Sequence, residues 1–492
     1  MSIESIQKEL LERLRARVAA FNSTDEEIYV QEIDNAAAFE YLSENIPLID
    51  CPDKTIENTY YFRWWTFRKH WKLTPKGHIL SEFLPQVYWA GPYNSINCSA
   101  CHHLREARWL KDANGRAQEY IDFFLNGHGD VYSYSMWFAS AYRSWLSLRG
   151  ETDGIEERLD KLIAIYTGWE KKALRKCGLF WSDDDRDAME YSISGSGFRP
   201  TLNSYMYGEA ASISALAEKC GKMQTAEDFA SRAGEIKRKV NELLWDEDFY
   251  RTIPAEQNEE ISGSSRPYVR DENRVRELVG YIPWYFDLPD QAKSGAFDQL
   301  LDEKGFYAPY GLTTAEQRHP RFLFYYEHEC LWNGYVWPFA TSQTLTALAS
   351  ALHNGKAGRL TAEDYTSLLH QYASSHVLRL PDGTQKPWID ENMHPYTGEW
   401  EARKELLADN WNPARGGYER GKDYNHSTFC DLVLSGLFGI DRVDGKIISR
   451  PLIPDDWEYF CVTGLTEKNT TVIYDKTGNH YGLGKGLIIL NG

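Results

Sequence analysis

Several kinds of segment are missing from this 492-residue sequence, and each absence argues against a class of protein. No run of 18 apolar residues occurs, so no transmembrane helix is predicted. The N-terminal residues 1–22 lack the apolar stretch and the small-residue cleavage site of a signal peptide. We therefore expect a cytoplasmic protein that does not engage a membrane.

Positive charge is also scarce. The sequence has 54 Lys and Arg against 72 Asp and Glu, which gives a net charge of −18. Because nucleic acids carry negative charge, this balance disfavours a nucleic-acid partner. With 42% hydrophobic residues, the chain can bury a large core without help from disulfides or metals.

The eight cysteines have no spacing typical of a disulfide framework, which favours reduced thiols. One string, Cys98-Ser-Ala-Cys101-His102, matches the attachment motif of c-type haem. Haem attachment requires export, and a zinc site would require a second Cys-x-x-Cys pair. We interpret these residues as buried thiols beside the start of a helix.

A calcium loop is the other metal site to consider. Asp183, Asp185 and Asp187 alternate like the first ligands of an EF-hand loop. The glycine and glutamate that complete such a loop are replaced by Ala188 and Ser194. The sequence therefore predicts neither a metal nor an organic cofactor.

Aromatic residues are abundant instead, at 14% of the chain with 17 Trp and 31 Tyr. Such side chains fill large cores. Their flat apolar faces also match the C–H face of a sugar ring. Composition thus raises carbohydrate as one candidate class of ligand.

Helical periodicity recurs along most of the chain, and adjacent pairs resemble helical hairpins. An amphipathic N-terminal helix is predicted by Ile6, Leu10, Leu11, Leu14 and Val18. Further helices are expected near 101–113, 115–126, 131–148, 155–174, 200–219, 223–244, 290–302, 328–352, 361–378 and 426–438. The long connections at 178–199, 250–275 and 303–327 are of a kind that is usually functional.

The pattern changes near Asp441, where short alternating runs punctuated by Gly, Asn and Asp predict antiparallel strands. We therefore predict an all-α fold, an (α/α)6 barrel, with a small C-terminal antiparallel β-domain. The expected parts are a helical lead-in at 1–45, a catalytic barrel at 46–440 and a β-appendage at 441–492. A general α-superhelix is the competing architecture, and the oligomeric state is not predicted.

Two acidic segments lie in predicted loops. The first runs from Trp181 to Glu190, and the second, Trp388 to Gly398, contains Asp390 and Glu391. A barrel brings distant loops together at one face. Two carboxyl groups across a glycosidic bond are what sugar hydrolysis requires, one as acid and one as base or nucleophile. Taken singly, each of these acids favours a structural role over a catalytic one.

A third segment, Trp332-Asn-Gly334-Tyr-Val-Trp337, follows the string 327–329, Glu-His-Glu. The adjacent acids and imidazole lack the i, i+4 spacing of a helical metal pair. Gly334 allows a sharp backbone turn, and the two Trp rings would then form the wall of a pocket.

With these motifs the sequence resembles the inverting (α/α)6-barrel glycoside hydrolases, which include processing α-glucosidases, trehalases and mannosylglycerate hydrolases. The resemblance covers roughly residues 85–440. Segment 332–337 resembles the family's W-x-G-P-x-W, with Tyr335 in place of proline, and segment 388–398 resembles E-N-Y-D-P-x-T-G. Residues 421–428 match the start of the final barrel helix loosely.

The resemblance implies site roles. It places Glu391 at the general-base position and Asp187 at the general-acid position, before the helix that contains Asn203. The family's E-S-G triplet is absent, and a different register would make Glu190 the acid. The early W-D-S segment is replaced by residues 97–106, so the family's substrate does not carry over.

The predicted function is exo-acting, inverting hydrolysis of a short, α-linked glycoside or glycosyl-glycerate. The alternatives are a sugar epimerase or isomerase that uses histidines such as His328, and a catalytically inactive carbohydrate-binding protein. Residues expected to contact a small oligosaccharide or glycoside are Trp89, His102, His103, Arg105, Trp181, Arg186, Tyr205, Trp332, Trp337, Trp388 and His426.

Overall fold

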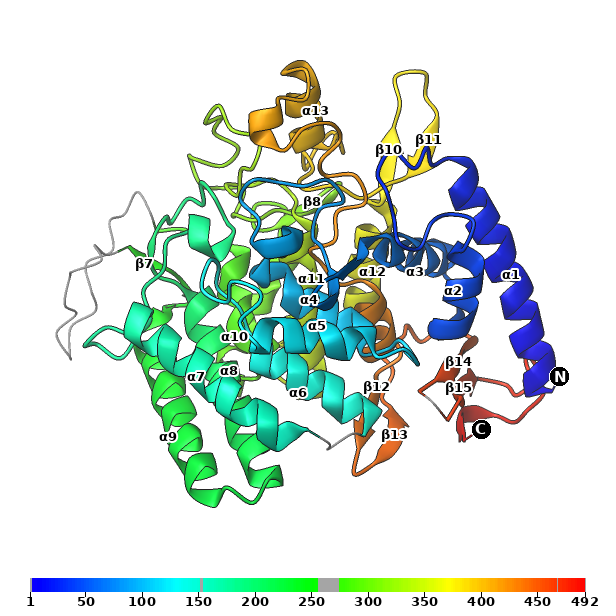
Figure 1. The fold of residues 1–492 in the computed structure, drawn as a ribbon, viewed down its shortest axis with the longest axis horizontal. Helices are drawn as coiled ribbons and strands as arrows, with labels where there is room; N and C mark the ends of the chain where they lie inside the picture. The colour runs from blue at the N-terminus through cyan, green and yellow to red at the C-terminus, as the bar shows by residue number, and fades with distance from the viewer. Residues whose placement is uncertain (1, 151–153, 255–273, 467, 492) are drawn as a thin grey trace.

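The computed structural model describes residues 2–150, 154–254, 274–466 and 468–491 (Figure 1). Of the long connection predicted at 250–275, residues 255–273 lie outside this description. Within the described ranges, no helix has the length and apolar character needed to cross a membrane.

A ring of buried helices forms the centre of the molecule, each packed on the next. In chain order they are α4 (Asn97–Ala107), α6 (Phe138–Arg149), α8 (Pro200–Lys219), α10 (Ile282–Tyr285), α11 (Pro338–His353) and the π-helical η9 (Leu432–Leu437). Small and apolar residues fill α11, and its buried residues occupy every face. A helix apolar on all sides belongs inside a protein, which explains its central place.

The ring closes between its first and last members. The carboxylate of Glu106 in α4 accepts the backbone N–H groups of Phe429, Cys430 and Asp431 at 2.5, 3.0 and 2.8 Å. Asp431 in turn pairs with Arg105 at 2.9 Å and with Arg108 at 2.6 Å. These charged groups join segments from opposite ends of the barrel sequence.

A second set of helices alternates with the ring along the chain, which gives helical hairpins. Its members are α3 (Lys54–Phe67), α5 (Arg116–Leu125), α7 (Ile155–Ala173), α9 (Met223–Lys239), η7 (Gln291–Leu300) and α12 (Ala362–Ser374). Helix α9 buries only one stripe: Ala226, Phe229, Ala233 and Ile236. Such a stripe is typical of an outer helix with its opposite face in water.

One predicted helix begins later than expected. The pattern over 328–352 predicts a single helix, but α11 starts at Pro338. Gly334 has φ +139°, and a Cβ there would come within 2.5 Å of the Phe322 ring. The backbone also bridges Val336 to Met393. Residues 328–337 are therefore a loop at the barrel end.

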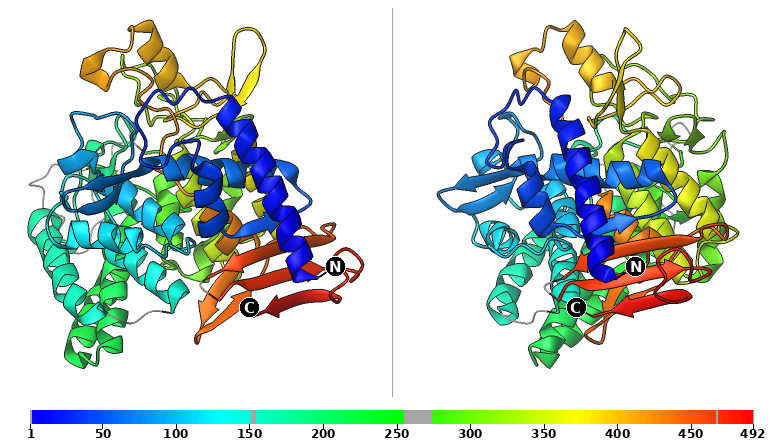
Figure 2. Two further views of the ribbon diagram at one scale, coloured as in Figure 1. Left: turned by 45° about the vertical axis from the view of Figure 1, so that its right-hand side comes forward. Right: turned by 90° about the vertical axis from the view of Figure 1, so that its right-hand side faces the viewer.

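The predicted C-terminal antiparallel sheet is present (Figure 2). It contains β14 (Tyr459–Leu465), β15 (Thr470–Asp475) and β16 (Gly486–Leu490), and its fourth strand is β1 (Leu48–Asp50). Leu48 lies opposite Thr463 in an antiparallel register. Strand β1, which lies within the range predicted for the barrel, thus forms the fourth strand of the C-terminal sheet.

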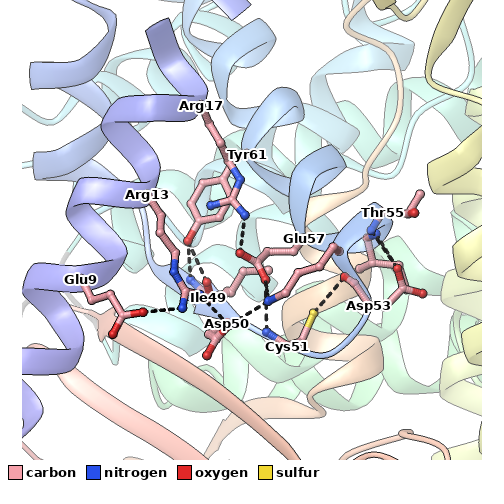
Figure 3. A network of polar contacts seen from close by, with 12 residues as sticks. Glu9, Arg13, Arg17, Ile49, Asp50, Cys51, Asp53, Thr55, Glu57 and Tyr61 are labelled. Carbon is pink, nitrogen blue, oxygen red and sulfur yellow. Dashed lines mark hydrogen bonds and ion pairs between the residues drawn. The ribbon is translucent and has the colours of Figure 1, made fainter. Parts of the chain in front are cut away.

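The N-terminal helix α1 (Ile3–Ser23) is attached to this region through charged groups (Figure 3). Arg13 contacts Asp50 of β1 at 2.9 Å, and Arg17 contacts Glu57 of α3 at 2.5 Å. Lys54 bridges Asp50 and Glu57 at 3.0 and 2.6 Å. The lead-in helix therefore packs as part of the fold, with the predicted residues Ile6, Leu10, Leu14 and Val18 buried and Leu11 half-buried.

Candidate active site

A cavity of about 420 Å³ lies where loops from many parts of the barrel converge. Its aromatic lining includes Tyr88, Trp89, Tyr134, Trp332, Trp337, Phe339 and Tyr424. Its charged and polar lining includes Glu82, Cys98, Asp185, Arg186, Glu190, His328, Glu329, Cys330, Glu391, Arg415, Arg420 and His426. Apolar walls with convergent polar groups are typical of a small-molecule site.

Glu190 brings an acid to this cavity. It follows a tight loop in which Ala188 has φ +58°, and its backbone carbonyl accepts the N–H of Trp332 at 3.0 Å. Burial raises the pKa of Glu190 to about 8, and the nearby carboxylates Asp185 and Glu391 add to the rise. The carboxyl is thus protonated at neutral pH, as a general acid must be.

Glu391 lies in the same cavity in a contrasting environment. The Arg420 guanidinium holds it in a bidentate contact, from Nε to Oε1 at 2.5 Å and from Nη2 to Oε2 at 2.9 Å. The Cys330 thiol donates to Oε2 at 3.2 Å. The bidentate guanidinium contact fixes the orientation of the Glu391 carboxylate in the cavity.

Behind Glu391, the neighbouring Asp390 is buried. Its Oδ1 accepts the backbone N–H of Glu391 at 2.9 Å, and its Oδ2 accepts the indole N–H of Trp388 at 3.1 Å. Burial and the Glu391 charge raise the pKa of Asp390 to about 7. Trp388 therefore supports the loop that carries Glu391 from outside the cavity lining.

The structure does not place Asp187, the residue predicted as the acid, at the cavity wall. Its side chain is fully buried against Arg199, whose Nε lies 2.6 Å from Oδ2. The hydroxyl of Ser135 donates to the other oxygen, Oδ1, at 2.5 Å. Asp187 thus lies outside the described cavity lining, whereas Glu190, the acid of the alternative register, belongs to it.

Five of the predicted substrate contacts do line the cavity: Trp89, Arg186, Trp332, Trp337 and His426. The Trp332 and Trp337 rings stack with their centroids 4.3 Å apart and 13° between their planes. The expected wall of two Trp rings is present. Both ring nitrogens of His426 and the indole N–H of Trp332 are buried with no hydrogen-bond partner among the described residues.

The other six predicted contacts lie away from the cavity lining of the described chain: His102, His103, Arg105, Trp181, Tyr205 and Trp388. His102 packs edge-on against Trp137 in the core, with 4.9 Å between ring centroids. His103 bonds the carbonyl of Asn425 at 2.6 Å. Arg105 is occupied by Asp431, and the hydroxyl of Tyr205 accepts a bond from Gln343 at 2.7 Å. Contacts within the protein thus hold His102, His103, Arg105 and Tyr205 away from the cavity lining.

Sequence reasoning missed Glu82, Cys330, Arg420 and Tyr424 in the cavity lining. Arg420 directly precedes the segment 421–428 and could have been found with it. Glu82 follows β3 (Gly77–Leu80) and belongs to no recognisable motif, so no pattern marks it. Burial raises its pKa to about 7.

No metal-binding arrangement of three or more His, Cys, Asp or Glu side chains occurs in the described part of the chain. Cys98 and Cys101, the two cysteines that match the haem attachment motif, are free thiols in α4. Burial raises the pKa of each well above its usual range. The Cys101 sulfur accepts the backbone N–H of Trp137 at 3.2 Å, which matches a packing role.

Comparisons with known proteins bear on this site. Residues 91–427 match the family described as mannosylglycerate hydrolase MGH1-like glycoside hydrolase domain. Curated proteins give no match. A solved chain named "Sialidase" is 37% identical with a TM-score of 0.87, and the alignment covers 98% of this chain and 43% of that one. This protein therefore spans less than half the length of that relative.

More distant solved structures share the fold. An α-L-rhamnosidase from Dictyoglumus thermophilum is 15% identical with a TM-score of 0.54, over 89% of this chain and 44% of that one. A GH63 mannosylglycerate hydrolase from Thermus thermophilus is 11% identical with a TM-score of 0.50, over 77% of this chain and 100% of that one. The predicted fold class, an (α/α)6 barrel with a C-terminal antiparallel sheet, is confirmed.

Proposed function

We propose, from the premise that this chain belongs to the mannosylglycerate hydrolase MGH1-like glycoside hydrolase family, that it removes one terminal sugar from a short glycoside with inversion. One observation carries the proposal. The cavity holds a carboxyl with a raised pKa, Glu190, together with an arginine-paired carboxylate, Glu391. Such a division into one proton donor and one proton acceptor is what inverting hydrolysis uses.

In the proposed reaction, Glu190 gives its proton to the glycosidic oxygen as the bond to the anomeric carbon breaks. The aglycone leaves as an alcohol. A water molecule attacks the opposite face of the anomeric carbon, and Glu391 accepts the proton that this water loses. Positive charge develops on the sugar in the transition state, and the ionised Glu391 stabilises it.

Other cavity residues act by positioning. Arg420 fixes the orientation of Glu391 through its two parallel contacts. The stacked Trp332 and Trp337 rings offer a flat apolar surface to the sugar. A volume of about 420 Å³ is at the low end for ligand pockets, which favours one or two sugar units over a long chain.

The test is a screen of the purified protein against aryl glycosides and natural disaccharides. We expect release of a free sugar whose first-formed anomer, seen by NMR, has the configuration opposite to that of the substrate. Retained configuration, or a covalent glycosyl adduct on Glu391, would contradict the inverting mechanism. Conversion of a sugar without release of an aglycone would instead support the epimerase alternative.

A further inference from the structure

We propose that the cavity accepts an uncharged sugar at the cleaved end of the substrate, and that Glu82 is the residue that binds this sugar's hydroxyl groups. The proposal rests on the glycoside hydrolase function proposed above. It adds the chemical class of the sugar and a residue that determines specificity. The charges that line the cavity and the polar groups left without a strong partner support it.

The guanidinium groups of the cavity already have carboxylate partners. Arg420 contacts Glu391 at 2.5 Å and Glu329 at 2.9 Å, and Arg415 contacts Glu329 at 3.3 Å. A sugar acid is normally bound by a free, planar guanidinium in a bidentate contact. To bind one here, Arg420 would have to release a buried carboxylate, which would then lie uncompensated.

The third guanidinium of the lining, Arg186, lies 3.4 Å from Asp185. Five carboxyl groups line the cavity against these three guanidinium groups: Glu82, Asp185, Glu190, Glu329 and Glu391. Burial raises the pKa of Glu82 to about 7 and that of Glu190 to about 8, and the other three carboxyl groups lie beside the three guanidinium groups. A carboxylate on the sugar would therefore have to compete with these carboxyl groups for a guanidinium, whereas a neutral polyhydroxylated sugar needs no positive partner.

Glu82 is the carboxyl best placed to bind such hydroxyl groups. It is 5% exposed and lines the cavity, and its Oε1 accepts the hydroxyl of Tyr424. Its backbone carbonyl accepts the N–H of Asn425 at 3.1 Å, which fixes it beside that segment. The carboxyl also has two neutral hydrogen-bond neighbours: the Cys98 thiol, 3.9 Å from Oε2, and the Ser99 hydroxyl. A thiol at that distance is a weak donor, so Oε2 can still accept a ligand hydroxyl.

His426 lies beside Glu82 on the same wall. The Tyr424 ring stacks on the His426 imidazole with centroids 3.6 Å apart. Burial holds the pKa of His426 well below its usual range, so the ring is neutral. A neutral imidazole offers one donor and one acceptor, and neither ring nitrogen has a partner among the described residues.

Buried polar atoms rarely stay without a hydrogen-bond partner. The two imidazole nitrogens on this wall therefore indicate that the bound ligand both donates and accepts hydrogen bonds there. A carboxyl acceptor and a neutral imidazole together match adjacent sugar hydroxyls, each of which both donates and accepts. A site built on such bonds strongly rejects a ligand that lacks them. Glu82 and His426 thus form the hydroxyl-binding wall.

The first experiment compares aryl glycosides in matched pairs: glucoside with glucuronide, galactoside with galacturonide, and mannoside with mannuronide, plus an aryl sialoside. We expect kcat/KM for the best neutral substrate to exceed that of its matched uronide by about 100-fold. Faster cleavage of a uronide or the sialoside would overturn the uncharged-sugar proposal while leaving the hydrolase function intact. If no glycoside were cleaved, the proposed function itself would fail.

The second experiment tests Glu82 with Glu82→Gln, which keeps the side-chain size. We expect kcat/KM for the neutral substrate to fall about 10–100-fold, as for loss of a charged hydrogen bond. Glu209→Gln is the matched control, because Glu209 is also buried with a pKa raised to about 7 but lies outside the cavity lining. It should leave kcat/KM within about threefold of the native value.

Deoxy analogues of the cleaved sugar locate the contact. Removal of the hydroxyl that Glu82 binds should cost the native enzyme about 10–100-fold and cost Glu82→Gln much less, because the two changes delete one interaction. Tyr424→Phe, which removes the hydroxyl that holds Glu82, should lower kcat/KM in the same direction by a smaller factor. If every deoxy analogue lowered kcat/KM of Glu82→Gln by the same factor as in the native enzyme, the assignment would be overturned.

Discussion

Asp187 and Glu190 lie three residues apart, yet they occupy opposite environments. The Asp187 carboxylate is enclosed by Arg199 and Ser135, and its charge is compensated inside the protein. Glu190 faces the cavity, and burial raises its pKa to about 8. The difference shows that an arginine partner compensates the charge of one buried carboxyl, whereas burial beside other carboxylates raises the pKa of the other.

The largest expected effect is on turnover. Glu190→Gln removes the proton donor and should lower kcat by about 10²–10⁴-fold while the protein stays folded. Asp187→Asn should leave kcat of the folded fraction close to native. Steady-state kinetics together with circular dichroism check both variants. Near-native turnover in Glu190→Gln beside an inactive but folded Asp187→Asn would reverse the assignment.

The next effect is on stability and concerns the other carboxyl. Asp187→Ala leaves the buried Arg199 without its counter-charge and should cost about 3–5 kcal/mol of unfolding free energy. Thermal unfolding followed by circular dichroism measures the loss. The double variant Asp187→Ala/Arg199→Met should recover part of it, because the uncompensated charge is then absent. Equal destabilisation by both variants would show that the pair's charge is unimportant.

A third prediction uses pH to separate the two environments. The pKa of Glu190 is raised by folding, so its contribution to stability is complete below its unfolded value near 4.5 and is lost as pH rises through about 8. Between these values the loss is about 1.4 kcal/mol per pH unit. Glu190→Gln should therefore lose less Tm than the native protein between pH 5 and pH 8.

Activity should follow the same titration. The acid must be protonated, so kcat/KM should fall as pH rises above about 8. A pH–rate profile with the best neutral substrate checks this limb. An alkaline limb that begins far above pH 9 would show that a group other than Glu190 supplies the proton.

The smallest predicted effect concerns Glu391, which is paired like Asp187 but faces the cavity like Glu190. Cys330→Ala removes the weak thiol donor to Oε2, together with the sulfur that accepts Arg420 Nη2 at 3.1 Å, and should lower kcat/KM about two- to fivefold. Cys330→Ser, which restores a donor, should recover most of this loss. A loss above about 100-fold in Cys330→Ala would assign the thiol a direct part in the reaction.

The elements that the sequence predicted well are those with local signals. The helix expected at 200–219 is observed as Pro200–Lys219, because proline favours its first turn and Gly221 follows its end. The expected strands of the C-terminal sheet are likewise present. In contrast, the helix expected from 328 begins at Pro338, because a loop folds against a distant segment.

The sequence predicted residues of the cavity only where they lie in or beside a recognisable motif. Glu391 and the Trp332–Trp337 wall lie in recognisable segments, and the cavity contains them. The choice between Asp187 and Glu190 depends on the φ of +58° at Ala188 and on which side chain meets Arg199. Neither feature can be read from residue types alone, and Glu82 reaches the cavity from a segment without any motif.

The pairing of β1 with β14 has a consequence for synthesis of the protein. Leu48 leaves the ribosome before its partner Thr463, which follows it by more than 400 residues. Until then, β1 has an unsatisfied edge, and Asp50 lacks the Tyr481 hydroxyl that contacts it at 2.9 Å. Completion of the sheet therefore has to await translation of β14, and a chain cut short before β14 would keep an open strand for chaperones or proteases to bind.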